Sequence, residues 1–236
     1  MSYSIATFCY GDRYYKQTNN LINSLSILDT PPNLFVVTDN ENSIEKKAFV
    51  NVKNIKEYNP KYSEYRNNYY DFDFSVKRFS LQFAFESGYN NVILTDTDVV
   101  VNYNLYSDET VKQSFIENAI AGQTTYNFLE QVNSNSMLGR RFLHYENRFD
   151  IFFDKGLLHE MPEDCIQYIS ISENKKFNFI DIWDKCIKIK DSDNLYNIPA
   201  GNIDEMCFSA CYNDIKIVNN SSKSINLLIA KHDKWY

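Results

Sequence analysis

The chain has 236 residues and a formal net charge of -7, and 16% of its residues are aromatic. This length suffices for one large domain with its own core, and the apolar content excludes a disordered chain. The acidic balance argues against a nucleic-acid-binding protein, because the binding domain of such a protein usually has a basic face.

Two further features bear on location. The N-terminus lacks a basic region followed by a long apolar segment, and no apolar run approaches the roughly 18 residues of a membrane span. The five cysteines are scattered and have no zinc-site spacing, which indicates reduced thiols. We therefore expect a cytoplasmic protein with no signal peptide and no membrane span.

The first 40 residues predict a strand, a helix and a second strand. Residues 4–9 are an apolar run with β-branched residues, and residues 15–28 have apolar side chains at helical spacing, with Asp12 as the expected N-cap. Residues 34–37 form the second apolar run. A strand-helix-strand pattern with short connections predicts a right-handed parallel unit.

A second helix leads into the next strand. Residues 76–87 predict a helix that Asp73 or Ser75 caps and that Gly88 ends. After a short turn, residues 92–95 predict a buried strand.

The remaining segments complete an α/β pattern. Residues 40–75 are irregular and rich in tyrosine, and we expect a loop-rich insertion there. Further elements are predicted as strands at residues 119–125, 166–172, 215–218 and 225–229 and as a helix at residues 203–212. Without an internal repeat or linker, the chain predicts one α/β domain with a mostly parallel central sheet flanked by helices.

Two carboxylates interrupt an apolar stretch in the sequence NVILTDTDVVV. In an extended strand Asp96 and Asp98 would project to the same side, where they tolerate burial only if a cation or several donors lie between them. Carboxylate oxygens suit a hard divalent ion such as Mg²⁺ or Mn²⁺. The alternative is a solvated strand end, in which each carboxylate accepts backbone N–H bonds.

Lys77 and Arg78 fall in the first turn of the predicted second helix. Cations are disfavoured there by a few tenths of a kcal/mol to about 1 kcal/mol, because the helix macrodipole is positive at its N-terminus. A bound diphosphate would reverse the sign of this effect. The alternative is that both side chains extend into solvent or pair with Asp71 and Asp73.

The segment VKRFSLQFAFESGYNNVILTDTDVVV, a helix leading into a strand that ends in Asp-x-Asp, resembles the GT-A type of nucleotide-sugar-dependent glycosyltransferases. The resemblance covers most of the chain in the order of elements and this segment in its residues. It implies one Rossmann-like domain over residues 1–236, in which roughly residues 1–105 bind the nucleotide sugar and residues 106–236 the acceptor. It also implies Mn²⁺ or Mg²⁺, a donor for which UDP-sugars are favoured, and a glycan, lipid-carrier or protein acceptor.

The same resemblance assigns roles to individual residues. Asp98 would be the principal metal ligand, and Asp96 would contact the metal or the donor. A basic residue at the position of Lys77 or Arg78 would contact the donor. The nucleoside contacts would come from the ends of the first two strands, at Thr7, Phe8, Cys9, Tyr10 and Asp39.

Two C-terminal features complete the predicted site. Asp204 and Glu205 lie at a helix start where such enzymes often bind the acceptor or place the base, although Asn202 with Glu205 also fits a capping box. The ending AKHDKWY resembles the His...Lys-Pro-Trp ending of some retaining glycosyltransferases, which implies His232 as a third metal ligand. Here the proline is missing and the spacing is compressed.

Two other functions stay open at this point. A phosphatase of the haloacid dehalogenase type also has a strand ending in DxDxV, with the first aspartate as nucleophile. That motif normally follows the first strand of the domain, whereas about 90 residues precede it here. A non-catalytic, carbohydrate-binding relative of the transferases is the third candidate.

Overall fold

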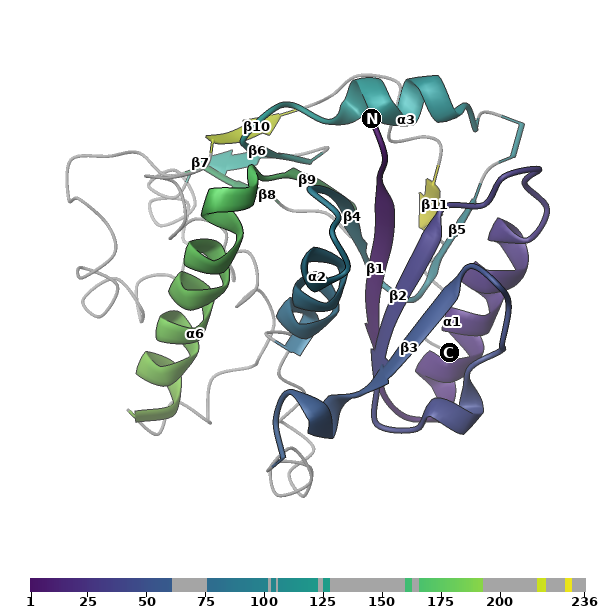
Figure 1. Cartoon of the computed structure of the whole chain (residues 1–236), viewed down its shortest axis with the longest axis horizontal. Coiled ribbons are helices and arrows are strands. Elements are labelled where there is room, and N and C mark those ends of the chain that lie inside the picture. The colour runs from purple at the N-terminus through teal and green to yellow at the C-terminus, as the bar shows by residue number, and fades with distance from the viewer. Residues whose placement is uncertain are drawn as a thin grey trace.

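The computed structural model describes residues 1–60, 76–101, 103–104, 106–122, 125–127, 160–162, 166–192, 216–219 and 228–230. These residues form an α/β fold in which helices flank a central sheet (Figure 1). In this part of the chain, no helix has the length and apolar character that a membrane crossing requires.

The strands are β1 (Ser4–Cys9), β2 (Asn33–Thr38), β3 (Val50–Asn54), β4 (Asn91–Thr95), β5 (Val99–Val101), β6 (Ala119–Gly122), β7 (Thr125–Asn127), β8 (Glu160–Pro162), β9 (Ile166–Ser170), β10 (Lys216–Asn219) and β11 (Leu228–Ala230). The α-helices are α1 (Asp12–Leu25), α2 (Lys77–Glu86), α3 (Asp108–Ser114) and α6 (Lys176–Ser192). The short 3-10 helices are η1 (Glu41–Ser43), η2 (Ile55–Glu57) and η5 (Glu173–Lys175).

The central sheet has seven strands in the order β10-β6-β9-β4-β1-β2-β3. Strand β9 is antiparallel to both of its neighbours, β4 and β6, and the other neighbouring strands are parallel. Among the described residues there are also two small antiparallel sheets, β5 with β11 and β7 with β8. The predicted α/β fold is confirmed, and the sheet is mixed rather than wholly parallel.

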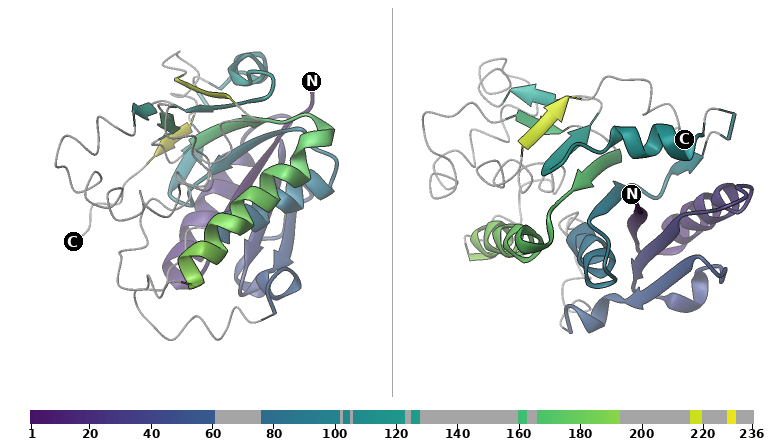
Figure 2. Two further views of the ribbon diagram at one scale, coloured as in Figure 1. Left: turned by 90° about the vertical axis from the view of Figure 1, so that its left-hand side faces the viewer. Right: turned by 45° about the horizontal axis from the view of Figure 1, so that its top comes forward.

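The two faces of the sheet bury different helices (Figure 2). Strand β1 is buried along its whole length, which is typical of a strand covered on both faces. Ile5 packs with Leu21 of α1 on one side, and Phe8 packs with Phe79 of α2 on the other. Helix α6 lies beside α2, where its Phe179 meets Phe85 edge to face with the ring centroids 6.5 Å apart.

The chain changes direction in the sheet between β1 and β4. From β1 it proceeds through α1 to β2 and β3, and α2 then returns it to the other side of β1 as β4. Open α/β sheets bind ligands at such a switch point, outside the carboxyl ends of the strands. Strand β1 pairs with β2 as far as Cys9 but with β4 only as far as Ala6, which lies opposite Leu94. The carboxyl ends of β1 and β4 are therefore not paired with each other.

The caps of the first two helices differ from the prediction. Helix α1 begins at Asp12 itself, and the N-cap is Gly11, whose φ of 83° suits a residue without a side chain. Helix α2 begins at Lys77 with Val76 at the N-cap, rather than Asp73 or Ser75. Neither cap residue provides a side-chain hydrogen bond. Gly88, with a φ of 90°, follows the end of α2 as predicted.

Several predicted boundaries and elements also change. Strand β3 lies in the segment expected to be loop-rich, and α3 and α6 occupy segments for which no helix was predicted. Helix α1 ends at Leu25 rather than at residue 28, because the hydroxyls of Ser24 and Ser26 bond to carbonyls of its last turn. The helix predicted at residues 203–212 lies outside the described residues.

Candidate functional site

The acidic motif lies in the connection between β4 and β5. Strand β4 ends at Thr95, and residues 97–98 form a turn, so the premise of an extended strand through Asp96 and Asp98 is wrong. Thr97 between them is buried, and its hydroxyl donates to Oε1 of Gln17 on α1 at 2.8 Å. Asp96 and Asp98 are half-buried. A buried threonine thus anchors the turn while both carboxylates retain access to solvent.

Lys77 supplies a positive charge to the first carboxylate of the turn. Its Nζ lies 2.6 Å from Oδ1 of Asp96, and the side chains are 12% and 36% exposed respectively. Lys77 is the first residue of α2, and the first turn of this helix contains no acidic residue. The negative charge of Asp96 therefore compensates the ammonium group of Lys77, which lies unfavourably at the positive end of a helix dipole. The ammonium group in turn compensates the half-buried carboxylate.

Arg78 has a different partner from its neighbour. Its Nε lies 2.5 Å from Oδ1 of Asp184 on α6, and its guanidinium group lies over the ring of Phe79 at 4.1 Å. The structure thus brings Lys77 to the acidic turn and Arg78 to α6. The two adjacent cations separate because α2 directs them toward different elements.

The end of β1 lies next to the acidic turn. The hydroxyl of Thr7 donates to the backbone carbonyl of Thr95 at 2.9 Å, which links the diverging ends of β1 and β4. Phe8 and Cys9 are also buried, whereas Tyr10 beyond the strand is half-buried. Burial raises the pKa of the Cys9 thiol to about 11, so this thiol is protonated at neutral pH. Of the four candidate nucleoside contacts at the end of β1, Tyr10 alone presents its side chain partly to solvent.

Asp39 follows the carboxyl end of β2, at the same edge of the sheet. It is half-buried, and its Oδ1 accepts a hydrogen bond from the hydroxyl of Tyr15 on α1 at 2.5 Å. Burial and this bond raise the pKa of Tyr15, so the phenol stays a donor. The edge therefore has half-buried polar side chains after three neighbouring strands: Asp39, Tyr10 and Asp96.

Gln17 and Tyr15 are site residues that the sequence analysis missed. Both lie at the start of the helix that follows β1, and this position near the carboxyl edge of a parallel sheet was the signal available in the sequence. Their partners, Thr97 and Asp39, are distant in sequence, so the contacts follow from the packing of α1.

Two carboxylates are a small donor set for a metal ion. Within the described ranges, no group of three or more His, Cys, Asp and Glu side chains gathers. Mg²⁺ is commonly bound by one or two carboxylates together with water and substrate phosphates. Asp96 and Asp98 fit an ion held in that way, rather than one in a cage of protein ligands. Asp204, Glu205 and His232 lie outside the described residues.

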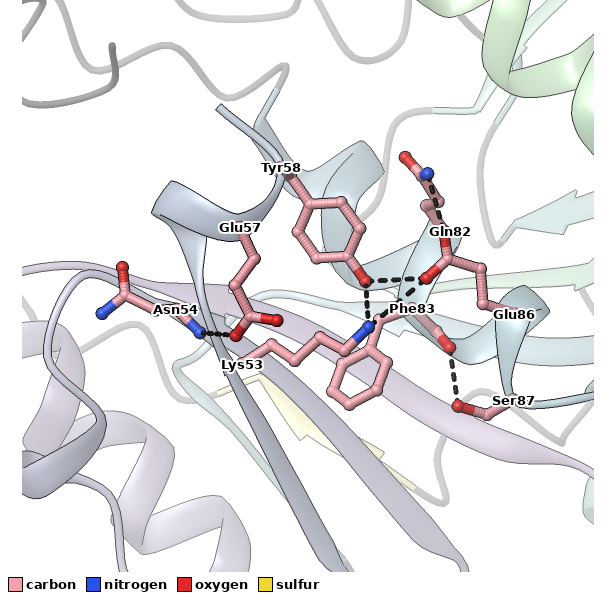
Figure 3. Close-up of polar contacts among 8 residues, drawn as sticks. All are labelled: Lys53, Asn54, Glu57, Tyr58, Gln82, Phe83, Glu86 and Ser87. Carbon is pink, nitrogen blue, oxygen red and sulfur yellow. Dashed lines mark hydrogen bonds and ion pairs between the residues drawn. The ribbon is translucent and has the colours of Figure 1, made fainter. Parts of the chain in front are cut away.

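A separate polar cluster joins the sheet edge to α2 (Figure 3). Lys53 of β3 contacts the hydroxyl of Tyr58 at 3.1 Å and Oε2 of Glu86 at 3.4 Å, and its Nζ lies 4.4 Å from the centre of the Phe83 ring. The hydroxyl of Tyr58 also donates to Glu86 at 3.1 Å. This Lys53 cluster fixes the edge strand against the helix whose first residue is Lys77.

Comparison with known proteins adds no assignment. No family model matches the chain, and no curated protein matches it in sequence. The position and chemistry of the residues at the carboxyl edge of the sheet are therefore the basis for a functional assignment.

Proposed function

We propose that the protein is a metal-dependent glycosyltransferase with a GT-A-type fold, which moves a sugar from a nucleoside diphosphate sugar to an acceptor hydroxyl. One observation carries the proposal. The Asp96-Thr97-Asp98 turn lies at the carboxyl end of β4, beside the end of β1, with Lys77 bound to Asp96. This is the switch point of the sheet, where α/β folds bind nucleotides.

The edge offers complementary groups for each part of such a donor. Tyr10 and Asp39 follow β1 and β2 and would contact the nucleoside. Lys77 and the N-terminus of α2 would contact the diphosphate. Asp98 and Asp96 would hold Mn²⁺ or Mg²⁺, which when bound supplies positive charge for the departing diphosphate.

Other residues of the chain have separate roles in the proposed reaction. Lys77 stabilises negative charge that develops on the leaving diphosphate, because α2 begins at this residue and holds its backbone beside the acidic turn. Thr97 and Gln17 keep the acidic turn in place. Asp204 and Glu205 are the proposed acceptor-binding or basic residues, and both an inverting and a retaining course remain compatible with them.

Hydrolysis of the donor in the absence of an acceptor tests this function. UDP-, GDP- and dTDP-sugars are incubated with Mn²⁺, and release of the nucleoside diphosphate is measured. We expect release from one donor class, a loss of more than about 100-fold in Asp98→Asn, and no loss in Asp29→Asn, which removes the same charge from an exposed position.

The alternative functions give other results in the same assay. A phosphatase of the haloacid dehalogenase type would release inorganic phosphate from p-nitrophenyl phosphate and leave nucleotide sugars intact. A non-catalytic sugar-binding protein would release neither product. Its sugar binding would also persist in Asp98→Asn and in the presence of EDTA.

A further inference from the structure

The carboxylate of Asp96 pairs with Lys77 within the described residues and would bind a second cation in the proposed function. Its Oδ1 is held by Lys77 at 2.6 Å, and the ammonium group belongs to a side chain that is only 12% exposed. The proposed metal ion would use the same carboxylate. The two cations therefore compete for one anion, and the one already present belongs to a largely buried side chain.

The start of α2 increases this competition. Helix α2 has no capping side chain and no acidic residue in its first turn, so its positive end and the Lys77 ammonium act in the same direction. A divalent ion on Asp96 meets both positive charges. A diphosphate beside them would relieve this repulsion, because its oxygens accept hydrogen bonds from Lys77 and coordinate the ion.

We propose that Lys77 couples the binding of the divalent cation to the binding of the diphosphate. Without the diphosphate, Lys77 neutralises Asp96 and weakens the binding of the metal. With the diphosphate, Lys77 pairs with a phosphate oxygen, and Asp96 becomes available to the ion. This inference rests on the proposed function and adds that neither ligand binds tightly alone.

The anchors of α2 make this role separable from a structural one. Arg78 is paired with Asp184 of α6, and Glu86 belongs to the Lys53 cluster at the other end of the helix. Neither contact involves Lys77. We therefore expect Lys77→Met to leave α2 in place and to change the charge beside Asp96.

The test measures two affinities in purified, full-length protein. Binding of Mn²⁺ alone is followed by the electron paramagnetic resonance of the free ion, and binding of UDP is measured by calorimetry with and without Mn²⁺; GDP or dTDP replaces UDP if it binds more tightly. We expect Lys77→Met to bind Mn²⁺ alone about fivefold more tightly and to bind the nucleotide with Mn²⁺ about tenfold more weakly.

Matched variants separate coupling from general effects. Lys112→Met removes a lysine from α3, where it pairs with Asp108, and should change neither affinity. Lys77→Arg keeps the charge and should retain most of the coupling. Because coupling is reciprocal, the factor by which Mn²⁺ strengthens nucleotide binding must equal the factor by which the nucleotide strengthens Mn²⁺ binding.

The possible outcomes distinguish a failure of the role proposed for Lys77 from a failure of the proposed glycosyltransferase function. If wild-type protein couples Mn²⁺ to the nucleotide and folded Lys77→Met shows the same coupling factor, the role of Lys77 is overturned while the proposed function stands. If Lys77→Met does not fold, Lys77→Gln is measured against the same criterion. If wild-type protein binds no nucleoside diphosphate with Mn²⁺, both the proposed function and this inference are overturned.

Discussion

Thr97 determines how the acidic turn is held. It is 5% exposed, and its hydroxyl donates to Gln17, which is itself buried at 6% exposure. A buried hydrogen bond contributes modestly when made, but a buried amide oxygen left without its donor costs about 1–3 kcal/mol. The residue between the two carboxylates is therefore a structural residue on which their orientation depends.

Thr97→Val removes the hydroxyl and keeps the shape of the side chain. We expect the free energy of unfolding in urea to fall by about 1–2 kcal/mol, since Gln17 loses its donor. Affinity for the nucleotide with Mn²⁺ should fall as well, because the turn is less firmly held. Thr110→Val, at a half-buried position of α3, is the control, and an equal loss in both variants would contradict the role of Thr97.

Cys9 makes the stability of the folded protein decrease at alkaline pH. Its ordinary pKa is 9.0, and burial raises the pKa to about 11 in the folded protein. Between these values the unfolded chain releases the thiol proton while the folded chain retains it. Stability from this group is therefore complete below pH 9 and is lost as the pH rises toward 11.

Urea unfolding at pH 8 and pH 10 measures this dependence. Between pH 8 and pH 10, the free energy of unfolding should fall by about 1 kcal/mol more in wild-type protein than in Cys9→Ala, which lacks the thiol. The cavity in Cys9→Ala lowers stability equally at both pH values. The buried tyrosines affect both proteins alike except for Tyr15, whose pKa Cys9 helps to raise as a minor cause. An identical pH dependence in the two proteins would mean that Cys9 ionises normally in the fold.

At the scale of elements, the buried central strands were predictable from their continuous apolar runs, and the edge strand of the sheet was not. Strands β1 and β4 match the sequence prediction closely because their residues are buried on both faces. Strand β3 was missed because it lies at the sheet edge, where Asn51 and Lys53 alternate with valines that are only half-buried. Local pattern alone does not distinguish such a strand from a loop.

The candidate site was predictable in its residue types and less so in its contacts. The sequence identified Asp96, Asp98 and Lys77, because two acids in an apolar run and a cation at a helix start are both locally unfavourable. The pairing of Lys77 with Asp96, and of Arg78 with Asp184, follows from how α2 packs against β4 and α6. That packing is set by contacts distant in sequence.

The Lys53 cluster shows which interaction holds the edge strand on α2. Its ion pair is partly solvent-exposed, and such pairs contribute about 0–1 kcal/mol. The Tyr58 ring stacks on Phe79 with the ring centroids 5.3 Å apart, and aromatic packing of this kind contributes more. We therefore attribute most of the stabilisation by this cluster to its rings.

Two substitutions of Tyr58 separate these contributions. Tyr58→Phe removes the hydroxyl bonds to Lys53 and Glu86 and should lower the free energy of unfolding by less than about 1 kcal/mol. Tyr58→Ala also removes the ring and should cost about 2–3 kcal/mol. Equal losses in urea unfolding would instead assign the stabilisation to the polar contacts.

At the scale of the whole molecule, the order of the strands brings the residues of the candidate site together. The crossover from β3 to β4 brings the ends of β1, β2 and β4 to one edge, and with them Tyr10, Asp39 and Asp96. The antiparallel direction of β9 was not predictable, because it depends on a long connection with no local signal for strand direction. The switch point itself needs only the first four strands, whose parallel pattern the sequence largely contained.

The central claim is that this edge binds a nucleoside diphosphate through a divalent cation. Calorimetric titration of UDP, GDP and dTDP into wild-type protein and Asp98→Asn, with Mn²⁺ or with EDTA, tests it most directly. We predict that one nucleotide binds wild-type protein with Mn²⁺ and binds at least about 30-fold more weakly with EDTA or in Asp98→Asn. Absence of binding with Mn²⁺, or equal binding with EDTA, would contradict the claim.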